Sequence, residues 1–239
     1  LPFPPESEGQ AGVRLRRMPF LPPHPLLPPQ DIEADAHIGP QQGGALMDHQ
    51  LKQLQDWISE SRHIVFFGGA GGSTESGIPD FRSVDGLYHQ QYAFPPETIL
   101  SHSFFERNPE EFYRFYRSKM LFPQARPNAA HWKLAELEAA GKLTAVVTQN
   151  IDGLHQAAGS KTVYELHGSV HRNHCMKCRR FYGLDFLLET GGVPRCPACG
   201  GVVKPDVVLY EECLDETTMV GAVEAIAAVK ALAEGVIPP

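Results

Sequence analysis

The chain has 239 residues, of which 42% are hydrophobic and 21% are charged, and its formal net charge is −7. This length and composition indicate one main globular domain with a small insert. The sequence contains no run of about eighteen apolar residues, so no membrane-spanning helix and no membrane partner are expected. A pI near 5.9 excludes a bulk electrostatic attraction to nucleic acid. We interpret the short basic cluster of Lys177, Arg179 and Arg180 as a solvated surface.

Residues 1–46 differ in composition from the rest of the chain. They are rich in proline, lack a strand-like or helical apolar period, and begin at Leu1 without an initiator methionine, so we expect a disordered extension. Acidic residues and prolines interrupt its arginines, and no targeting peptide is predicted. Met47 offers a natural start, and the apolar spacing from Asp48 onward predicts a helix.

A glycine-rich turn follows the first predicted strand. Residues 64–67 are a continuous apolar run, which is typical of a parallel strand covered on both faces. The four glycines among residues 68–72 allow backbone N–H groups to approach a pyrophosphate, and Ser73 adds a hydroxyl. Because Thr74 stands where G-x-G-x-x-G needs its last glycine, the cluster alone could be an ordinary tight loop. The sequence Ser-Gly-Ile-Pro-Asp-Phe-Arg-Ser that follows at once favours a dinucleotide phosphate site.

An aromatic-rich stretch with helical spacing comes next. It contains six Phe and Tyr side chains between residues 104 and 116, and Asn108-Pro109 is typical of a helix start. We interpret most of these aromatic side chains as core.

Polar residues cluster where two further strands should end. The apolar residues 143–147 precede Gln149, Asn150 and Asp152, and another strand-like run precedes His167. Since ligands of open parallel sheets bind at the carboxyl ends of the strands, these side chains should face the same crevice as the glycine-rich turn. Taken singly, the Asn and Asp could be turn formers and the His a buried core residue.

Four of the five cysteines form two C-x-x-C pairs separated by seventeen residues, a spacing expected of a tetrahedral zinc site. Two disulfides or four buried thiols are the alternatives, and the tight-turn residues around the second pair argue against both. Four thiolates close the coordination shell, so one Zn²⁺ ion would be structural. Thiolates committed to a metal imply a reducing compartment, and we expect a cytoplasmic protein. The predicted ligands are Cys175, Cys178, Cys196 and Cys199.

In order and approximate spacing, these motifs resemble those of the bacterial-type sirtuins, which are NAD-dependent protein lysine deacylases. The motifs concerned are Gly-Ala-Gly-x-Ser, Gly-Ile-Pro-Asp-Phe-Arg, Thr-Gln-Asn-Ile-Asp and His-Gly, and the likeness covers about residues 47–222. It implies an α/β fold: a Rossmann-like doubly wound parallel sheet with a helical module and a small zinc-binding module at about residues 170–204.

The resemblance also implies how NAD binds. Its pyrophosphate would lie on the turn at residues 70–73, its nicotinamide would enter a pocket beside Ile78, and Gln149 would orient the ribose. Phe81 and Arg82 would close over the nicotinamide. The residues expected to bind NAD are Gly69, Ala70, Gly71, Ser73, Ile78, Asp80, Phe81, Arg82, Gln149, Asn150 and Asp152.

The implied reaction is the removal of an acetyl group from a protein lysine. The acetyl oxygen attacks the ribose carbon that loses nicotinamide, and Asp152 or its hydrogen-bond network stabilises the developing positive charge. His167 acts as general base on a ribose hydroxyl, because an imidazole accepts a proton near neutral pH. Asn150 is the third expected catalytic residue. The products would be nicotinamide, free lysine and O-acetyl-ADP-ribose.

The expected partner is an acetylated protein or peptide, bound by a monomer without nucleic acid. The peptide should pair as an added strand along Val207, Val208, Leu209 and Tyr210. Tyr113 and Tyr116 align with a Tyr-x-x-Arg pair of desuccinylating relatives and are expected at the acyl chain. Because the second position is Tyr, which lacks the charge and the fork of Arg, a neutral acyl group is favoured.

One departure from the family pattern concerns the C-terminal end. A Gly-Thr-Ser turn and a Leu-Ile-Asn strand end, which hold the adenosine of NAD in complete sirtuins, do not occur, and residues 215–234 are typical of one final helix. We therefore expect a truncated tail at 223–239, a sheet incomplete at its C-terminal side, and weakened NAD binding. Two alternatives remain open: a protein ADP-ribosyltransferase, or a catalytically impaired zinc-bearing fragment that only contacts partners.

Overall fold

The computed structural model describes residues 40–80 and 94–233, with side chains for residues 48–80 and 94–232. Phe81 and Arg82, and most of the disordered extension predicted for residues 1–46, lie outside the described residues. Internal contacts separate the chain into two compact units, residues 1–52 and 53–239. The described part of the first unit is the beginning of helix α1 (Pro40–Glu60), which starts at Pro40 rather than at Asp48.

The second unit is built around a three-stranded parallel sheet. In spatial order its strands are β1 (Ile64–Gly68), β2 (Leu143–Thr148) and β3 (Val163–Glu165). The carboxyl ends of the three strands lie at one edge, and the loops that leave this edge carry both polar motifs.

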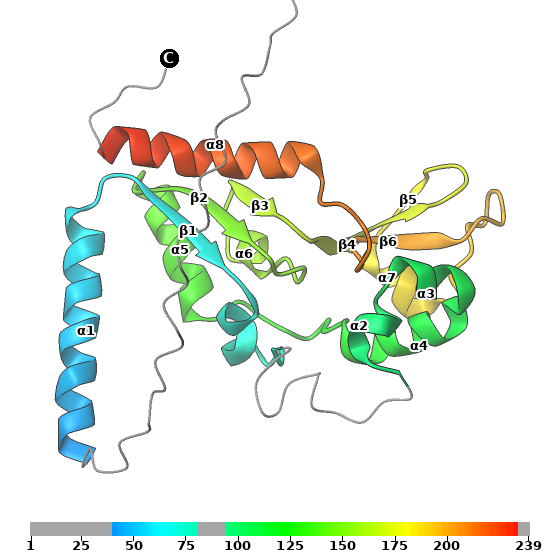
Figure 1. Cartoon of the computed structure of the whole chain (residues 1–239), viewed down its shortest axis with the longest axis horizontal. Helices are drawn as coiled ribbons and strands as arrows, with labels where there is room; N and C mark the ends of the chain where they lie inside the picture. The colour runs from blue at the N-terminus through cyan, green and yellow to red at the C-terminus, as the bar shows by residue number, and fades with distance from the viewer. Residues whose placement is uncertain (1–39, 81–93, 234–239) are drawn as a thin grey trace, which may run out of the picture. The chain divides into compact units, whose positions relative to one another are not determined.

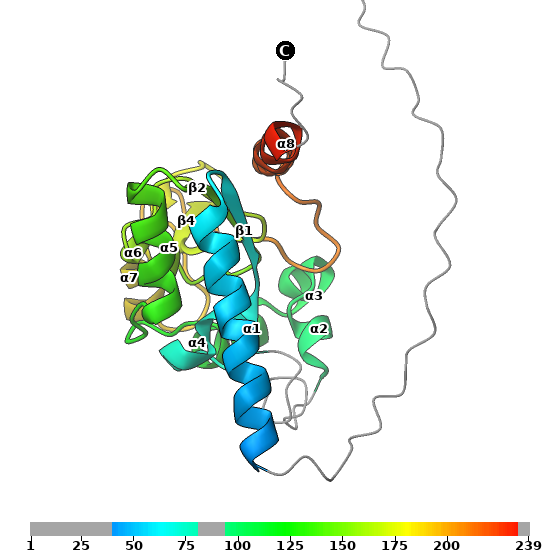
Figure 2. The same cartoon turned by 90° about the vertical axis from the view of Figure 1, so that its left-hand side faces the viewer.

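Two helices cover opposite faces of this sheet (Figures 1 and 2). They are α5 (Ala129–Ala139) and α8 (Glu216–Ala233). Neighbouring residues of β2 point to opposite faces, so Val146 packs in a cluster with Leu134 of α5, while Val147 packs with Ala222 of α8. This arrangement confirms the doubly wound α/β class, and α8 matches the final helix expected at residues 215–234.

A group of short helices forms the helical module expected between the two polar motifs. Its helices are α2 (Pro96–Ile99), α3 (His102–Arg107) and α4 (Pro109–Lys119). Their aromatic side chains are packed edge to face or stacked with ring centroids 5.0–6.0 Å apart. These rings belong to the largest hydrophobic cluster, which continues into the cysteine-bearing module.

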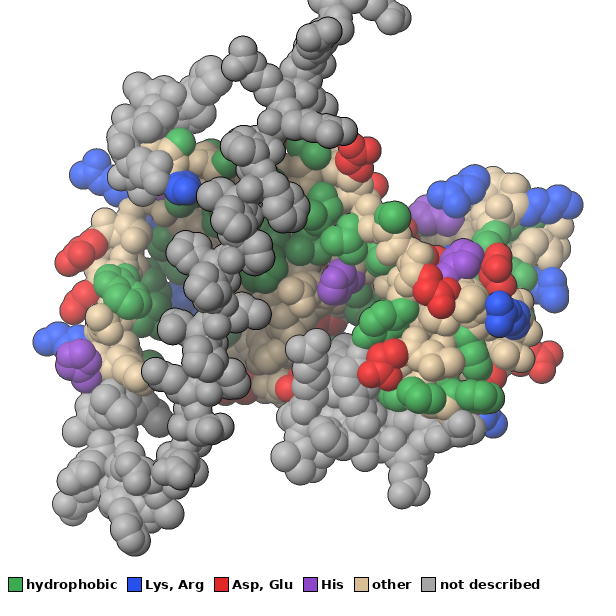
Figure 3. All heavy atoms as spheres, viewed as in Figure 1, with side chains coloured by type: hydrophobic (Ala, Val, Ile, Leu, Met, Phe, Trp, Pro, Cys, Tyr) green, Lys and Arg blue, Asp and Glu red, His purple; other side chains and the backbone are tan. Residues whose placement is uncertain are grey.

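That module is a second, antiparallel sheet with spatial order β5-β4-β6. Its elements are β4 (Gly168–Cys175), β5 (Phe181–Tyr182), α7 (Leu184–Glu189) and β6 (Val203–Val207). Lys and Arg side chains gather at its outer end (Figure 3), where Lys177, Arg179 and Arg180 are exposed. Cys213, the fifth cysteine, is also exposed.

Among the described residues, no helix is both long enough and apolar enough to cross a membrane.

Candidate active site

The glycine-rich turn follows β1 directly and forms a short 3-10 helix, η1 (Ala70–Ser76). The turn ends at Gly77, whose φ of 81° lies in the left-handed region that glycine adopts without a Cβ penalty. A Cβ atom on Gly71 or Gly72 would meet nothing within 4 Å. Packing within the described chain therefore does not require glycine there, and the open space suits the close approach of a ligand to the backbone.

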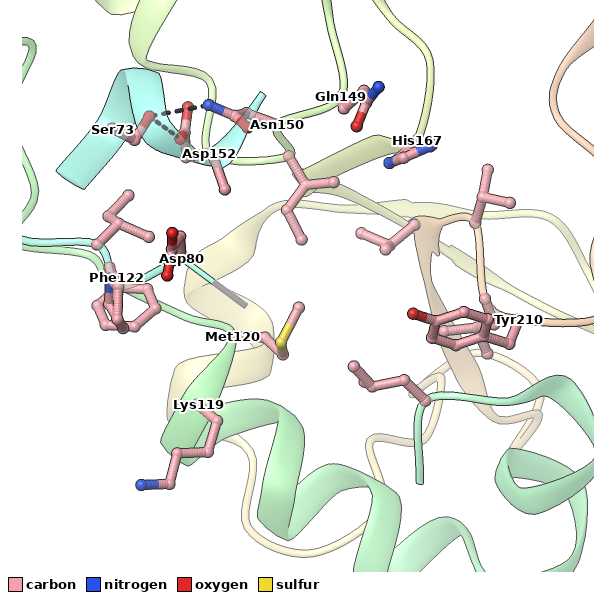
Figure 4. Close-up of a pocket in the computed structure, with 18 of the residues that line it drawn as sticks. Ser73, Asp80, Lys119, Met120, Phe122, Gln149, Asn150, Asp152, His167 and Tyr210 are labelled. Atoms are coloured by element: carbon pink, nitrogen blue, oxygen red, sulfur yellow. Dashed lines mark hydrogen bonds between the residues drawn. The ribbon is translucent and has the colours of Figure 1, made fainter. Parts of the chain in front are cut away.

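Ser73 connects this turn to the second polar motif. Its Oγ donates to Asp152 Oδ2 at 2.7 Å and accepts from Asn150 Nδ2 at 3.0 Å (Figure 4). The other carboxylate oxygen of Asp152 accepts from the backbone N–H of Leu154 at 2.9 Å, at the first residue of α6 (Leu154–Ala157). Ser73 is only 1% exposed, so its hydroxyl fixes the two neighbouring side chains.

The two motifs line one cavity of about 580 Å³, a size typical of small-molecule sites. In Figure 4 the cluster around Ser73 lies on one side, Tyr210 lies on the other, and Met120 lies between them. The predicted site residues that line it are Ala70, Ser73, Ile78, Asp80, Gln149, Asn150, Asp152, His167, Val207, Val208, Leu209 and Tyr210.

Four of the residues expected to bind NAD do not line this cavity within the described chain or cannot be placed. Gly69 and Gly71 belong to the turn but are not among the lining residues. Phe81 and Arg82 lie outside the described residues.

Tyr113 and Tyr116 are in the core rather than at the cavity. Both are 0% exposed, and the Tyr113 hydroxyl donates to the backbone oxygen of Val203. Burial raises the pKa of both phenols. The expectation that they contact an acyl chain therefore needs correction, because α4 turns these rings into the module's interior. Met120, which follows α4, lines the cavity instead.

The segment at residues 208–212 forms the wall opposite η1. Val208 N–H donates to the backbone oxygen of His167 at 3.0 Å, and Tyr210 N–H donates to that of Leu100 at 3.0 Å. The Leu209 N–H donates to the Glu212 carboxylate at 2.9 Å. These three N–H groups are therefore used within the chain, and strand addition along residues 207–210 stays a prediction.

Charged side chains hold this segment in place. Glu212 lies 2.7 Å from His102 Nδ1 and 3.0 Å from Lys204 Nζ. Glu211 has a φ of 76°, a left-handed conformation that costs a non-glycine residue about 1–2 kcal/mol. Its carboxylate accepts from both the backbone N–H and the Oγ of Ser103, at 2.9 and 3.0 Å.

Two buried imidazoles lie behind the second motif. His131 and His155 are 1% and 5% exposed, and their ring centroids are 4.6 Å apart. Burial, reinforced by the neighbouring imidazole and opposed by Asp152, lowers the pKa of His155 to about 4. Burial likewise lowers the pKa of His131, against the opposing effect of Asp152. Both rings are therefore neutral at physiological pH.

Sequence reasoning missed Asn128, His102, Lys204 and Glu212. Asn128 caps α5 and contacts the glycine-rich turn. Its sequence signal was the Asn-x-x-His spacing, in which His replaces the usual Glu or Gln of a capping box. The other three gave no signal, because their contacts join segments far apart in the sequence.

The four paired cysteines lie together at the end of the second sheet. Their Sγ atoms are all within 4.8 Å of one another, with Cys175–Cys199 at 3.4 Å and Cys178–Cys196 at 3.6 Å. A tetrahedral site with Zn–S bonds of about 2.3 Å places its sulfurs about 3.8 Å apart, so the cluster fits one zinc ion. The Tyr182 hydroxyl donates to Cys196 Sγ at 3.0 Å, a contact that stabilises a thiolate.

These features define a dinucleotide-binding α/β protein with a structural four-cysteine metal site. A model described as the Sir2 family matches residues 69–233. A Clostridium perfringens protein named NAD-dependent protein deacetylase is 60% identical over 182 residues, which are 75% of this chain and 75% of that protein. A Cutibacterium acnes protein of the same name is 55% identical over 186 residues, which are 77% of this chain and 76% of that protein.

Solved structures show the same similarity. One described as Sir2 with a p53 peptide and NAD+ has a TM-score of 0.63 and 43% identity, and the match covers 73% of this chain and 70% of that chain. Another, described under the mechanism and regulation of Sir2 enzymes, has a TM-score of 0.66 and 44% identity, covering 75% and 72%. The chain belongs to the Sir2 family.

Proposed function

We propose that this chain is an NAD-dependent protein deacetylase that converts acetylated protein lysines and NAD into free lysine, nicotinamide and O-acetyl-ADP-ribose. One observation carries the proposal: residues of the glycine-rich turn and of the Thr-Gln-Asn-Ile-Asp motif line a single cavity together with His167. The deacetylase names of the bacterial relatives support it. So do the Sir2 structures described as bound to acetylated and propionylated peptides.

NAD supplies the ribose carbon that accepts the acyl oxygen, and nicotinamide is its leaving group. The carboxylate of Asp152 accepts from a hydroxyl and a backbone N–H. None of the ion pairs found among the described residues includes it. Its negative charge therefore acts on the contents of the cavity, where it stabilises positive charge on the ribose. Asn150, fixed by its bond to Ser73, orients the leaving group.

His167 is the general base in this proposal. It stands in the turn between β3 and β4 and lines the cavity beside Gln149 (Figure 4). Its backbone oxygen is bound by Val208 N–H, which ties the base to the wall that receives the peptide. The imidazole takes the proton of a ribose hydroxyl as that oxygen attacks the acyl carbon.

The acyl group in this proposal is neutral. Met120, Ile151 and Leu214 give the cavity apolar lining, and a carboxylated acyl chain would lose hydration beside these side chains. The proposed substrate is therefore an acetylated protein. Because zinc-bound thiolates need a reducing compartment, the cytoplasm is the proposed location.

The test is a product analysis. The purified chain is incubated with NAD and an acetyl-lysine peptide, and nicotinamide, deacetylated peptide and O-acetyl-ADP-ribose are quantified by mass spectrometry. We expect the three in equal amounts, and no nicotinamide release when the unacetylated peptide is used. ADP-ribose attached to protein, with the peptide still acetylated, would replace this proposal by ADP-ribosyl transfer. Zinc-loaded, folded protein that yields no product would leave a partner-binding fragment.

A further inference from the structure

Asn128 caps α5, and both the oxygen and the nitrogen of its side-chain amide form hydrogen bonds. Its Oδ1 accepts from the backbone N–H groups of Ala130 and His131, at 3.0 and 3.3 Å. Its Nδ2 donates to the backbone oxygen of Gly72 at 2.8 Å, across 56 positions of sequence. The orientation of the amide is unambiguous, because a flipped amide would set its NH₂ against two N–H donors and its oxygen against a carbonyl.

Gly72 immediately precedes Ser73, the residue that connects the two motifs. Fixing this carbonyl fixes the peptide plane that leads into Ser73, whose Oγ holds Asn150 and Asp152. A continuous set of hydrogen bonds therefore runs from the beginning of α5, through the glycine-rich turn, to the side chains proposed to act at the nicotinamide.

The capping residue also contacts a buried imidazole. His131 Nδ1 lies 3.2 Å from the backbone nitrogen of Asn128 and 2.9 Å from its Oδ1, and the ring is 1% exposed. The His131 ring therefore helps to fix the position of the capping residue. Since α5 packs against β2 through Leu134, the beginning of the helix is a fixed support for a turn that otherwise consists mostly of small residues.

We propose that Asn128 is a positioning residue for NAD: its amide holds the Gly72 carbonyl so that the turn and the Ser73–Asn150–Asp152 cluster keep the geometry that receives the dinucleotide. This inference rests on the proposed function. Asn128 does not line the cavity, so it acts through the turn and does not touch the reacting atoms.

Helix capping alone does not explain this choice of residue. Asp and Ser cap helices about as well as Asn, but neither offers the amide donor that Gly72 accepts. Asn128→Ser keeps a capping oxygen and removes the donor without adding charge. Asn128→Asp keeps the shape and the cap, but sets a carboxylate against the Gly72 carbonyl. Both substitutions therefore remove the contact to the turn while keeping the cap that stabilises α5.

The experiment measures NAD affinity by calorimetry, together with the separate KM values for NAD and for acetylated peptide. For Asn128→Ser we expect NAD affinity to fall and KM for NAD to rise by about fivefold to a hundredfold, the range for losing one hydrogen bond to a partly buried group. KM for the peptide and the thermal midpoint should stay close to those of the unaltered chain. Asn128→Asp should show the larger NAD defect.

A matched control comes from the other end of the same helix. Glu138 accepts from the backbone N–H groups of Lys161 and Thr162, both at 2.7 Å, and does not line the cavity. Glu138→Ala should lower the thermal midpoint while leaving KM for NAD unchanged. Unchanged NAD affinity in a folded Asn128→Ser variant, or an equal NAD defect in Glu138→Ala, would overturn the proposal. Calorimetry needs no turnover, so its result stands even if the product analysis finds no deacetylation.

Discussion

The two walls of the cavity are held by different kinds of contact. On the η1 wall, Ser73, Asn128 and Asn150 are neutral donors and acceptors, and they fix one carboxylate, Asp152. On the wall at residues 208–212 the anchors are charged: Glu212 binds His102 and Lys204. Under the proposed function, damage to the η1 wall should affect NAD and damage to the 208–212 wall should affect the peptide. The difference in charge also indicates that only the second wall should respond to pH near neutrality.

The largest effect should come from losing the metal that holds the second sheet. Structural zinc contributes an apparent ~10–16 kcal/mol in small zinc domains, and here its ligands lie at the end of β4, in the turn after it and in the loop before β6. Cys175→Ser should lower bound zinc and unfold this module, as followed by metal analysis and near-UV circular dichroism. Because β6 leads into the 208–212 wall, peptide binding should be lost with it.

Cys213→Ser is the matched control for this experiment, because Cys213 is exposed and outside the cluster. It should keep its zinc and its fold. A Cys175→Ser protein with an unchanged thermal midpoint and no metal would show that zinc does not stabilise the module.

The next effect concerns the proposed general base, His167. His167→Ala should lower kcat by about 10²- to 10⁴-fold, the usual contribution of a general base, while NAD affinity and the thermal midpoint change little. Steady-state kinetics and NAD calorimetry on the same preparation measure this. Turnover at the unaltered rate by the folded variant would assign the proton transfer to another group.

A smaller effect separates the charged wall from the neutral one. Glu212→Gln keeps the shape but weakens the contacts to His102 and Lys204 and the bond from Leu209 N–H. KM for the acetylated peptide should rise by about tenfold, since hydrogen bonds to charged groups contribute about 1.5–3 kcal/mol, and KM for NAD should not change. Glu106→Gln is the control, because Glu106 is 60% exposed and lies 3.4 Å from the same imidazole. A peptide KM that is equal in both variants would remove Glu212 from its anchoring role.

The smallest effect is a pH dependence of that anchor. The hydrogen bond to Glu212, opposed by burial and aided by the charges of Glu212 and Glu106, raises the pKa of His102. Burial alone would raise the pKa of Glu212, but the Leu209 N–H, His102 and Lys204 lower it, so this carboxylate stays ionised. A raised histidine pKa stabilises the fold below the unfolded value of about 6.5, and this contribution is lost as pH rises through the folded pKa.

The measurement is the thermal midpoint against pH for the unaltered chain and for His102→Gln. The difference between the two should be greatest below about pH 6.5 and shrink as pH increases. Because His102 is 38% exposed, solvent screening keeps the effect small. A difference that does not change with pH would mean that His102 holds the segment by shape alone.

The sequence was most informative where chemistry and strand ends coincide. The glycine-rich turn, the polar run at 149–152 and the paired cysteines follow from spacing and from the rule that parallel-sheet ligands bind at carboxyl strand ends. The final helix was also predictable, because one long segment rich in alanine and free of proline fixes its type.

The other features of the site depended on how the helices and strands pack together, which residue spacing does not determine. Tyr113 and Tyr116 stand on α4, whose four aromatic residues are all buried, so periodicity could not separate a cavity face from a core face. The partners of Glu211 and Glu212 at residues 102 and 103 are about 110 positions away. The use of the N–H groups of residues 208–210 within the chain likewise depends on how the helical module docks against the segment after β6.

The comparison of the two walls is tested most directly by measuring KM for NAD and KM for acetylated peptide in Ser73→Ala and Glu212→Gln side by side. Ser73→Ala frees Asn150 and Asp152, so we expect KM for NAD to rise and KM for the peptide to stay unchanged. Glu212→Gln should show the reverse pattern. If both variants alter the same constant, or if neither constant moves in either folded variant, the two walls do not serve separate substrates and the assignment of the cavity is wrong.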